Sequence, residues 1–297
     1  MSILEVKDLH KSFGSKTVLD GLSFSVSEGS VFGFIGSNGA GKTTTMKIIL
    51  GLLRADSGEV TVCGEKVRFG CTEKYIGYLP DVPEFYGYMT AKEYLRLCGE
   101  IAGMKQSEIK KRTAELLELV GLAGEKHRIK GYSRGMKQRL GIAQALINSP
   151  RLLICDEPTS ALDPIGRKEI LDIISSARGE TSVLFSTHIL SDVERICDSM
   201  AILNGGKNAL SGDVSELRSR RSRSDLLITL SDHARLQSTA DLLGGTVTES
   251  GVIIISSASQ ETVFKTLSAI SEHKIPVLKV EHAEPDLEQL FMEVIGK

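Results

Sequence analysis

An α/β fold built on a parallel sheet is predicted for residues 1–216 of this 297-residue chain, and a smaller α+β domain for residues 226–297. Short apolar runs such as 31–35 alternate with segments of helical periodicity, and strands that alternate with helices form parallel sheets covered on both faces. A glycine-rich turn follows the run 31–35 directly, which is typical of a buried strand that feeds a helix. The chain is also longer than one ordinary domain, which favours two compact units.

The N-terminal part is predicted to begin with strands, because apolar residues alternate or cluster at 3–9, 18–26 and 31–35. A helix starts near Gly41, and a hairpin follows at residues 58–68. Residues 90–122 then carry helical periodicity, which predicts a helical insertion in the α/β pattern.

The α/β pattern resumes after this insertion. Helices are predicted at residues 134–147, 164–177 and 189–197. Strands are predicted between and after them, at residues 151–155, 181–186 and 199–203. These elements complete the predicted parallel sheet.

A domain boundary is predicted at residues 217–225, a polar stretch rich in serine and arginine. A solvated linker explains these arginines, although phosphate or lipid contact stays open. Beyond it, strands and helices are predicted in the order βαββαβ plus a helix, which is the split-βαβ, ferredoxin-like arrangement. The segments are 226–230, 234–243, a strand pair within 246–256 around Glu249, 260–272, 276–281 and 285–295. The histidines of this predicted domain are not spaced like the ligands of a metal site; they are His233, His273 and His282.

The bulk composition excludes several classes of protein. Hydrophobic residues make up 41% and charged residues 25%, as in soluble globular proteins. The formal net charge of -2 argues against a protein that coats nucleic acid or an anionic membrane. No apolar stretch approaches the roughly 20 residues that cross a bilayer, and the N-terminus shows neither a basic leader nor a hydrophobic signal core. The chain is therefore expected to be cytosolic and to have no nucleic-acid partner.

A phosphate-binding loop is predicted between the strand 31–35 and the helix after it. The pattern G-x-x-x-x-G-K-[ST] is matched by Gly36, Ser37, Asn38, Gly39, Ala40, Gly41, Lys42 and Thr43. The glycines let backbone N–H groups turn toward a polyphosphate, and the helix N-terminus adds partial positive charge. Lys42 would reach the outer phosphates of ATP, the Thr43 hydroxyl would ligate Mg²⁺, and Thr44 would touch the α-phosphate. A glycine-rich turn that binds nothing is the alternative, and the strand-turn-helix context argues against it.

Two adjacent carboxylates follow the apolar strand 151–155. Asp156 and Glu157 would lie at the C-terminal edge of the sheet, where ligands of open α/β sheets bind. Asp156 would hold Mg²⁺ through water, and Glu157 would accept a proton from the attacking water. Taken alone, an acidic pair before a Pro-Thr-Ser turn is also a common helix-capping signal.

These motifs resemble those of the ABC ATPases, in family order, over about residues 1–210. The Walker-B and D-loop segment of that family resembles DEPTSALDP at 156–164. The family signature, usually Leu-Ser-Gly-Gly-Gln, is similar to residues 132–139, YSRGMKQR, and the family's switch histidine resembles His188 after SVLFST. The resemblance implies a P-loop NTPase fold with a parallel-sheet core, an antiparallel β subdomain and a helical subdomain at about 82–150.

The resemblance also implies roles for single residues. Phe13 stands where the family keeps an aromatic residue that stacks on adenine, and His188 would contact the γ-phosphate. Asp81 stands where the family usually keeps a glutamine that senses Mg²⁺ and the attacking water. Asp163, in the D-loop segment, is expected to be one of the nucleotide-binding residues. The catalytic set would then be Glu157, His188 and Asp81, and the Mg²⁺ set Thr43, Asp156 and Asp81.

The signature segment implies a dimer. Ser133 and the N–H of Gly135, at the start of helix 134–147, would form an anion site far from this chain's own phosphate loop. Two subunits facing head to tail would sandwich two ATP molecules, so ATP would close the dimer and hydrolysis would open it. Considered without the other motifs, Ser133 would be interpreted as a plain helix N-cap and His188 as a histidine at the end of a strand.

Three residues depart from the family pattern. Arg134 and Met136 alter the signature, so the contact with the opposing nucleotide would rely on Ser133, Gly135 and an added cation. Asp81 is shorter than glutamine and only accepts hydrogen bonds, so its reach to Mg²⁺ would need a water. Slow turnover is one expected result.

The predicted function is the ATP-hydrolysing subunit of an ABC transporter at the cytoplasmic face of the membrane. Its partners would be a separate permease and a second ATP-binding subunit, in a homodimer or a heterodimer. YLPD at 78–81 and YSRGMKQRL at 132–140 resemble the ABC-2 exporter subfamily. A soluble ABC protein acting on ribosomes or DNA is the first alternative, but such proteins commonly carry two cassettes or long coiled coils. A kinase or GTPase on the same loop is the second, and it would have no use for the signature.

Overall fold

The computed structural model describes residues 1–71, 75–219, 225–232, 235–248, 250–256, 258–282 and 287–295. The chain divides into two compact units, Glu216–Leu287 and a larger one made of Met1–Ser215 with Glu288–Lys297. Three predicted features lie outside the described residues, namely His233, Glu249 and the linker residues 220–224.

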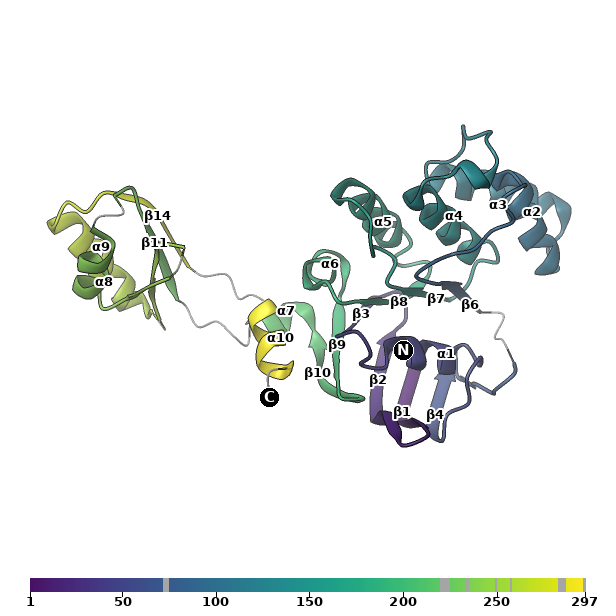
Figure 1. Cartoon of the computed structure of the whole chain (residues 1–297), viewed down its shortest axis with the longest axis horizontal. Helices are drawn as coiled ribbons and strands as arrows, with labels where there is room; N and C mark the ends of the chain where they lie inside the picture. Colours follow the sequence, from purple (N-terminus) through teal and green to yellow (C-terminus); the bar gives the residue numbers. More distant parts are fainter. Residues whose placement is uncertain are drawn as a thin grey trace. The chain divides into compact units, whose positions relative to one another are not determined.

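A six-stranded sheet forms the centre of the larger unit, with the strand order β10-β9-β3-β8-β7-β6 (Figure 1). Its strands are β3 (Val31–Gly36), β6 (Ile76–Leu79), β7 (Leu152–Asp156), β8 (Ser182–Thr187), β9 (Ser199–Asn204) and β10 (Lys207–Asp213). Neighbours from β9 to β6 run parallel, and β10 pairs antiparallel with β9. Every residue of β3, β7 and β8 is buried, as in strands covered on both faces. The predicted parallel sheet is confirmed.

A second, antiparallel sheet has the order β2-β1-β4-β5. Its strands are β1 (Ser2–Phe13), β2 (Lys16–Ser27), β4 (Ser57–Val62) and β5 (Glu65–Lys66). The helix α1 (Lys42–Ile49) packs in one hydrophobic core with both sheets through Met46 and Ile49. In Figure 1 this sheet and α1 lie on the side of the six-stranded sheet opposite α4 and α5. The start of α1, which directly follows the phosphate loop, is therefore held between two sheets.

The predicted helical insertion forms α2 (Ala91–Ile101) and α3 (Gln106–Leu119), followed by the 3₁₀ turn η1 (Ile129–Gly131) and α4 (Arg134–Leu146). A capping box starts α2, because the Thr90 hydroxyl accepts from the Glu93 N–H and the Glu93 carboxylate accepts from the Thr90 N–H. The Tyr94 hydroxyl donates to Gln144 Oε1 at 3.0 Å and so ties α2 to α4. The insertion is thereby fixed to the helix that carries the signature segment.

The remaining helices of the larger unit are α5 (Pro164–Ser176), α6 (Leu190–Ile196) and α7 (Val214–Ser219). The sequence patterns did not predict β6, β10 and α7. β6 is only 4 residues long, and β10 is an edge strand whose residues alternate between exposed and half-buried. Such short or half-exposed segments carry little apolar periodicity. Because α7 ends at Ser219, the first residues of the predicted linker 217–225 are helical.

The smaller unit is an antiparallel sheet of order β12-β13-β11-β14 with two helices. Its elements are β11 (Leu226–Leu230), α8 (Leu236–Leu243), β12 (Thr246–Val247), β13 (Val252–Ile255), α9 (Gln260–Glu272) and β14 (Val277–His282). Alternate residues of β11 and β13 form its core, including Ile228, Leu230 and Ile253. The predicted βαββαβ order is confirmed.

The last helix, α10 (Leu287–Ile295), departs from the predicted domain organisation. The prediction placed it in the accessory domain 226–297, whereas residues from Glu288 onward group with the larger unit. Asn204 Nδ2 donates to the Val294 carbonyl at 3.2 Å, and Leu290 and Phe291 are half-buried. An amphipathic helix needs an apolar surface to cover, but its sequence does not say which one. The prediction was therefore wrong about where α10 packs.

The described helices are all short. The longest, α3, has 14 residues, which at about 1.5 Å per residue is shorter than the roughly 30 Å of a bilayer core. None of the helices in the described ranges could therefore span a membrane.

Candidate active site

The phosphate loop connects β3 to α1. Gly41 caps α1 in the left-handed region, at φ 111°, and a Cβ here would lie 2.7 Å from Leu19 Cδ2. Only glycine is tolerated under these two constraints. The buried Lys42 side chain folds back over the loop, where its Nζ donates to the Gly36 carbonyl at 2.7 Å. The ammonium therefore lies inside the curve that the loop makes.

Asp156 ends β7 and contacts the start of α1. Its Oδ2 accepts from the Thr43 hydroxyl at 2.9 Å, and its Oδ1 accepts from the Ser186 hydroxyl at 2.8 Å. Ser186 lies beside Asp156 in the parallel register of β7 and β8. Burial and the nearby carboxylates of Asp156 and Asp81 raise the pKa of Tyr78 to about 12, so this phenol stays neutral.

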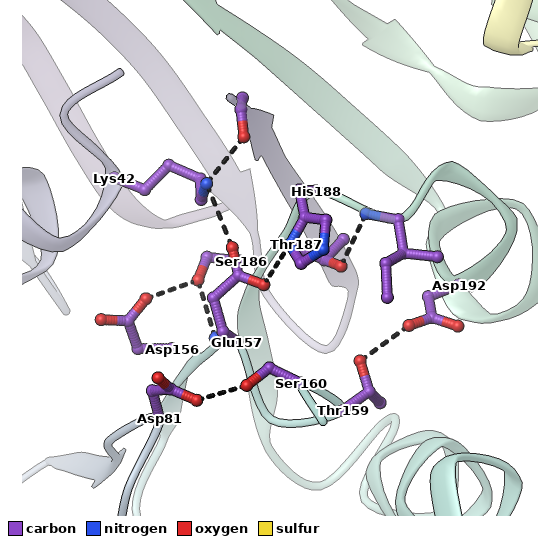
Figure 2. Close-up of polar contacts among 12 residues, drawn as sticks. Lys42, Asp81, Asp156, Glu157, Thr159, Ser160, Ser186, Thr187, His188 and Asp192 are labelled. Atoms are coloured by element: carbon purple, nitrogen blue, oxygen red, sulfur yellow. Dashed lines mark hydrogen bonds and ion pairs between the residues drawn. The ribbon is translucent and has the colours of Figure 1, made fainter. Parts of the chain in front are cut away.

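The carboxylate of Glu157 lies between two cationic or polar side chains (Figure 2). Its Oε2 is 2.7 Å from His188 Nδ1, and its Oε1 is 3.1 Å from Lys42 Nζ. Oε1 is buried but has no aligned hydrogen-bond donor among the described residues. The backbone at Glu157 is in the left-handed region, at φ 48°, and its N–H donates to the Ser186 hydroxyl at 3.0 Å. The side chain is therefore held in place while one oxygen keeps a free lone pair.

A cavity of about 390 Å³, called here the nucleotide cavity, joins these groups. It is lined by Lys16, Val18, Ser37, Asn38, Gly39, Gly41, Lys42, Thr43, Thr44, Asp81, Asp156 and Glu157. Most of the predicted loop residues thus meet both carboxylates in one space. Phe13 pairs with Lys16 across the β1–β2 hairpin, is 51% exposed and has Lys11 Nζ 5.3 Å from its ring centre. An exposed ring beside the cavity is available for stacking.

The oxygen atoms that line this cavity are suitable ligands for Mg²⁺. Oxygen atoms are the ligands that Mg²⁺ prefers, and Thr43 Oγ1 and Asp156 Oδ2 lie 2.9 Å apart. Mg²⁺ usually keeps waters and phosphate oxygens beside one or two protein ligands, so this pair is sufficient. The described residues contain no cluster of three His, Cys, Asp or Glu side chains that would suit a transition metal instead.

The structure brings Asp81 to the cavity but turns its carboxylate toward the protein. Asp81 Oδ1 accepts from the Ser160 hydroxyl at 2.5 Å and lies 3.6 Å from an Arg134 guanidinium nitrogen. The predicted water-mediated contact of Asp81 with Mg²⁺ stays a prediction.

The signature residues lie away from the nucleotide cavity, because none of them lines it. Ser133 is exposed and caps α4 by accepting from the Met136 N–H at 3.2 Å, and Gly135 follows in the first turn. Asp163 caps α5 in the same way and accepts from the Gly166 N–H at 2.7 Å. Ser133 and Asp163 are exposed on the surface of the unit, and Gly135 is half-buried.

A buried network that the sequence patterns did not predict joins the Glu157 loop to the helix after His188. Asp192, only 1% exposed, accepts from the Thr159 hydroxyl at 2.8 Å and from Arg167 Nε at 2.6 Å. Arg167 also donates to the Ser191 hydroxyl at 2.9 Å. The network holds the segments that carry Glu157 and His188 against each other.

We expect Asp192→Ala to lower the free energy of unfolding by about 3–5 kcal/mol, because it leaves Arg167 and Thr159 without their buried partner. The matched control is Asp172→Ala, since Asp172 also pairs with an arginine, Arg195, at 2.7 Å but is 57% exposed. That change should cost less than about 1 kcal/mol. Urea unfolding of the full chain by circular dichroism measures both, and equal shifts in the midpoint would contradict the expectation.

Other residues of the site were also missed by the sequence patterns. Lys16 and Val18 line the nucleotide cavity, Ser186 bridges Asp156 and Glu157, and Ser160 bonds to Asp81. Ser186 precedes the motif histidine by two positions, at the end of a strand next to β7. Aligning the ends of the predicted strands 151–155 and 181–186 would have placed Ser186 beside Asp156. The position of Ser160 could not be predicted in this way, because it depends on the path of a loop.

Comparisons with known proteins place this site in context. The family model described as "ABC transporter" matches residues 19–160. The bacitracin transport ATP-binding protein BcrA of Bacillus licheniformis is 38% identical, and the match covers 99% of this chain and 98% of that protein. The linearmycin resistance ATP-binding protein LnrL of Bacillus subtilis (strain 168) is 37% identical, with 99% of each chain covered. A solved ATP-binding subunit of an ABC transporter is 34% identical with a TM-score of 0.66, and the match covers 73% of this chain and 92% of that one.

Proposed function

Because the chain belongs to the ABC transporter family as an ATP-binding subunit that hydrolyses ATP, we propose that it powers an exporter by ATP-driven dimer closure and hydrolysis-driven opening. The observation that carries the proposal is the placement of Glu157. One of its oxygens is held by His188, and the other is buried, lies 3.1 Å from Lys42 Nζ and accepts no aligned hydrogen bond in the described part of the chain. A carboxylate oriented in this way is suited to accept a proton.

In the proposed reaction water attacks the γ-phosphorus of ATP, the bond from this phosphorus to the β,γ-bridging oxygen breaks, and ADP leaves as phosphate forms. Glu157 Oε1 accepts the proton of the attacking water, and His188 keeps the carboxylate oriented through Oε2. Lys42 exchanges its carbonyl and carboxylate partners for the outer phosphates and stabilises their charge. Mg²⁺, held by Thr43 and Asp156, would supply further neutralisation of the phosphate charge when bound.

A second copy of the chain is proposed to complete each site. The exposed Ser133 and the half-buried Gly135 lie at the N-terminus of α4, where N–H groups and the helix dipole favour an anion. They do not line their own chain's nucleotide cavity. A head-to-tail dimer would place them, with Asp163, against the nucleotide of the partner. A homodimer is the simplest assembly of this kind.

The proposed docking surface for the permease is a cavity of about 480 Å³, called here the docking cavity. Its lining includes Asp81, Val82, Phe85, Lys130, Arg134 and Lys137. Beside it, Tyr86 is 55% exposed, and its ring centre lies 5.8 Å from that of Tyr88. An apolar hollow with basic and aromatic margins suits a short helix inserted in a groove. Through this contact the subunit would be held at the cytoplasmic face of the membrane.

Phe85 is half-buried and its ring packs edge-on against the buried Tyr94 at 5.1 Å, whereas Tyr86, whose ring also meets Tyr94 edge-on at 6.3 Å, is 55% exposed. The aromatic segment therefore combines a packing residue with exposed ones. A test of docking must use the exposed residues.

We expect Tyr86→Glu to weaken association with the permease and to uncouple transport, because a charge replaces an exposed ring beside the docking cavity. MgATP binding and the thermal melt of the isolated chain should not change. The matched control is Phe69→Glu, at an aromatic residue that is 62% exposed and lies outside the cavity. Co-purification with the permease measures the effect, and normal assembly and transport with Tyr86→Glu would exclude this surface.

The direction of transport is tested in inside-out vesicles that hold the chain and its permease. The permease to try first is the product of an adjacent gene with about six hydrophobic spans. ATP-dependent accumulation inside such vesicles supports export, whereas ATP-dependent loss from them contradicts it. Bacitracin and linearmycin, which the names of two relatives carry, are the first substrates to test.

A further inference from the structure

Asp56 lies directly before β4 and makes three contacts with the last part of β1. The ladder between β1 and β4 ends at the pair His10 and Ser57. Beside it, the Asp56 N–H donates to the His10 carbonyl at 3.0 Å. The Asp56 carboxylate accepts from the Lys11 ammonium at 2.7 Å and from the Ser12 N–H at 2.7 Å. The side chain of Asp56 thus continues the contact with β1 after the backbone ladder has ended.

The ion pair of Asp56 and Lys11 fixes the position of the ammonium. The Lys11 ammonium and the Ser12 N–H hold the pKa of the Asp56 carboxyl below its ordinary value, so the carboxylate is charged at neutral pH. The Lys11 side chain is only 13% exposed, although Asp56 is 46% exposed. A lysine side chain that is free in solvent samples many rotamers, and this contact selects one of its positions.

The selected position places the ammonium over the ring of Phe13. Lys11 Nζ lies 5.3 Å from the centre of that ring. A cation within about 6 Å of a ring centroid is attracted by the electrons of the ring face. Phe13 is itself 51% exposed, so the ammonium closes one side of the ring while much of the residue stays accessible. A nucleobase would then stack on the side that is turned away from Lys11.

The Phe13 ring is close to the nucleotide cavity. Phe13 pairs across the β1–β2 turn with Lys16, and Lys16 lines the cavity. The face of an aromatic ring carries partial negative charge, which repels the electron-rich face of a purine. An ammonium on the far side of the ring draws this charge toward itself. The open face of Phe13 is therefore a better stacking partner for adenine than that of an isolated ring.

We propose that Asp56 and Lys11 determine how tightly the adenine base of ATP is bound, by holding the Phe13 ring with one face closed by the ammonium and the other open to the base. This inference rests on the proposed function, because it requires MgATP as the substrate and Phe13 as the stacking ring. Asp56 and Lys11 are positioning residues in it, since neither of them lines the nucleotide cavity. A clamp that only supports the hairpin fold is the competing role of Asp56.

Substitutions in the full chain separate the two roles by their effects on KM and kcat. Lys11→Met keeps the length of the side chain and removes its charge. It should raise the KM for MgATP about 2- to 5-fold, the ratio expected for an exposed cation–π contact, with kcat unchanged. Asp56→Ala should raise the KM at least as much, and the double variant should match Asp56→Ala alone. Lys11→Arg keeps a cation over the ring and should preserve the KM.

The matched control is the ion pair of Glu59 and Lys66, on β4 and β5 of the same sheet. Its length is also 2.7 Å, and Glu59 is 47% exposed, nearly as much as Asp56. Glu59→Ala and Lys66→Met should therefore leave the KM for MgATP unchanged. Thermal melts of all variants show whether any of them disturbs the fold.

A fluorescent reporter distinguishes binding of the base from binding of the phosphates. The chain has no tryptophan, so Phe13→Trp places a single indole where the base would stack. MgATP should change its emission, whereas magnesium tripolyphosphate, which has no base, should bind without this change and displace MgATP. Adding Lys11→Met or Asp56→Ala should weaken the binding of MgATP about 2- to 5-fold and leave the affinity for tripolyphosphate unchanged.

The proposal is overturned if these variants weaken MgATP and tripolyphosphate by the same factor, because the whole site is then disturbed. Lowered melts or normal melts with an unchanged KM in both Lys11→Met and Asp56→Ala also overturn it. A Phe13→Trp chain whose emission does not respond to bound MgATP removes its premise. Failure of the proposed function looks different, because the unmodified chain would then hydrolyse no ATP.

Discussion

Glu157→Gln is expected to bind MgATP and to lower kcat at least ~10²-fold, the effect of losing a positioned general base. The amide keeps the shape of the side chain but has no free carboxylate oxygen to take the proton that Oε1 would accept. Because ATP then stays bound, the chain should accumulate as a dimer. Steady-state turnover and light scattering at saturating MgATP measure the two effects.

The control for Glu157→Gln is Glu180→Gln, the same change at an exposed position outside the nucleotide cavity. Lys42→Ala should fail earlier, at nucleotide binding, because the outer phosphates lose their cation. A Glu157→Gln chain that stays monomeric while the parent dimerises would contradict the sandwich arrangement. Normal turnover would contradict the role of Glu157.

Ser133→Arg is expected to abolish hydrolysis and to leave ATP binding by the monomer near normal. The added bulk would stand at the N-terminus of α4, where the proposed dimer places the γ-phosphate of the partner. The matched control is Ser259→Arg, since Ser259 also caps a helix, α9, and accepts from the Thr262 N–H at 3.2 Å. Losing a cap alone costs about 1 kcal/mol of stability and should leave turnover unchanged.

Mixing subunits tests whether Ser133 acts on the partner. A Lys42→Ala chain combined with a Ser133→Arg chain can assemble one site that contains neither change, so part of the activity should return. Turnover is measured across mixing ratios, with heterodimer formation checked by differently tagged chains. Mixed dimers that form but remain inactive would show that Ser133 does not serve the opposing nucleotide.

Much of the fold could be predicted because buried strands leave a strong pattern. β3, β7 and β8 are buried along their whole length and each contains a run of apolar residues, and each is followed by a helix in the sequence. The edge strand β10 and the short β6 carry no such pattern and were missed. α10 was recognised as a helix, but the surface it packs on depends on contacts across the chain that periodicity does not encode.

The candidate site could be predicted only as far as its motifs are contiguous. The phosphate loop and the Asp156-Glu157 pair come together as expected, since each follows its own strand of one sheet. The direction of the Asp81 carboxylate could not be predicted, because it depends on Ser160, which lies 79 positions further along. Asp192 was missed for the same reason: its partners Thr159 and Arg167 lie on other elements.

The return of the chain to its larger unit at α10 bears on any experiment that shortens it. A truncation after Ser215 removes α10 together with the smaller unit and leaves Asn204 without its bond to the Val294 carbonyl. An internal deletion that keeps α10 changes the smaller unit alone. The smaller unit is in effect a closed loop, and the entropy of closing a loop grows only with the logarithm of its length. It can therefore unfold, or accept insertions, without much loss in the tethering of α10.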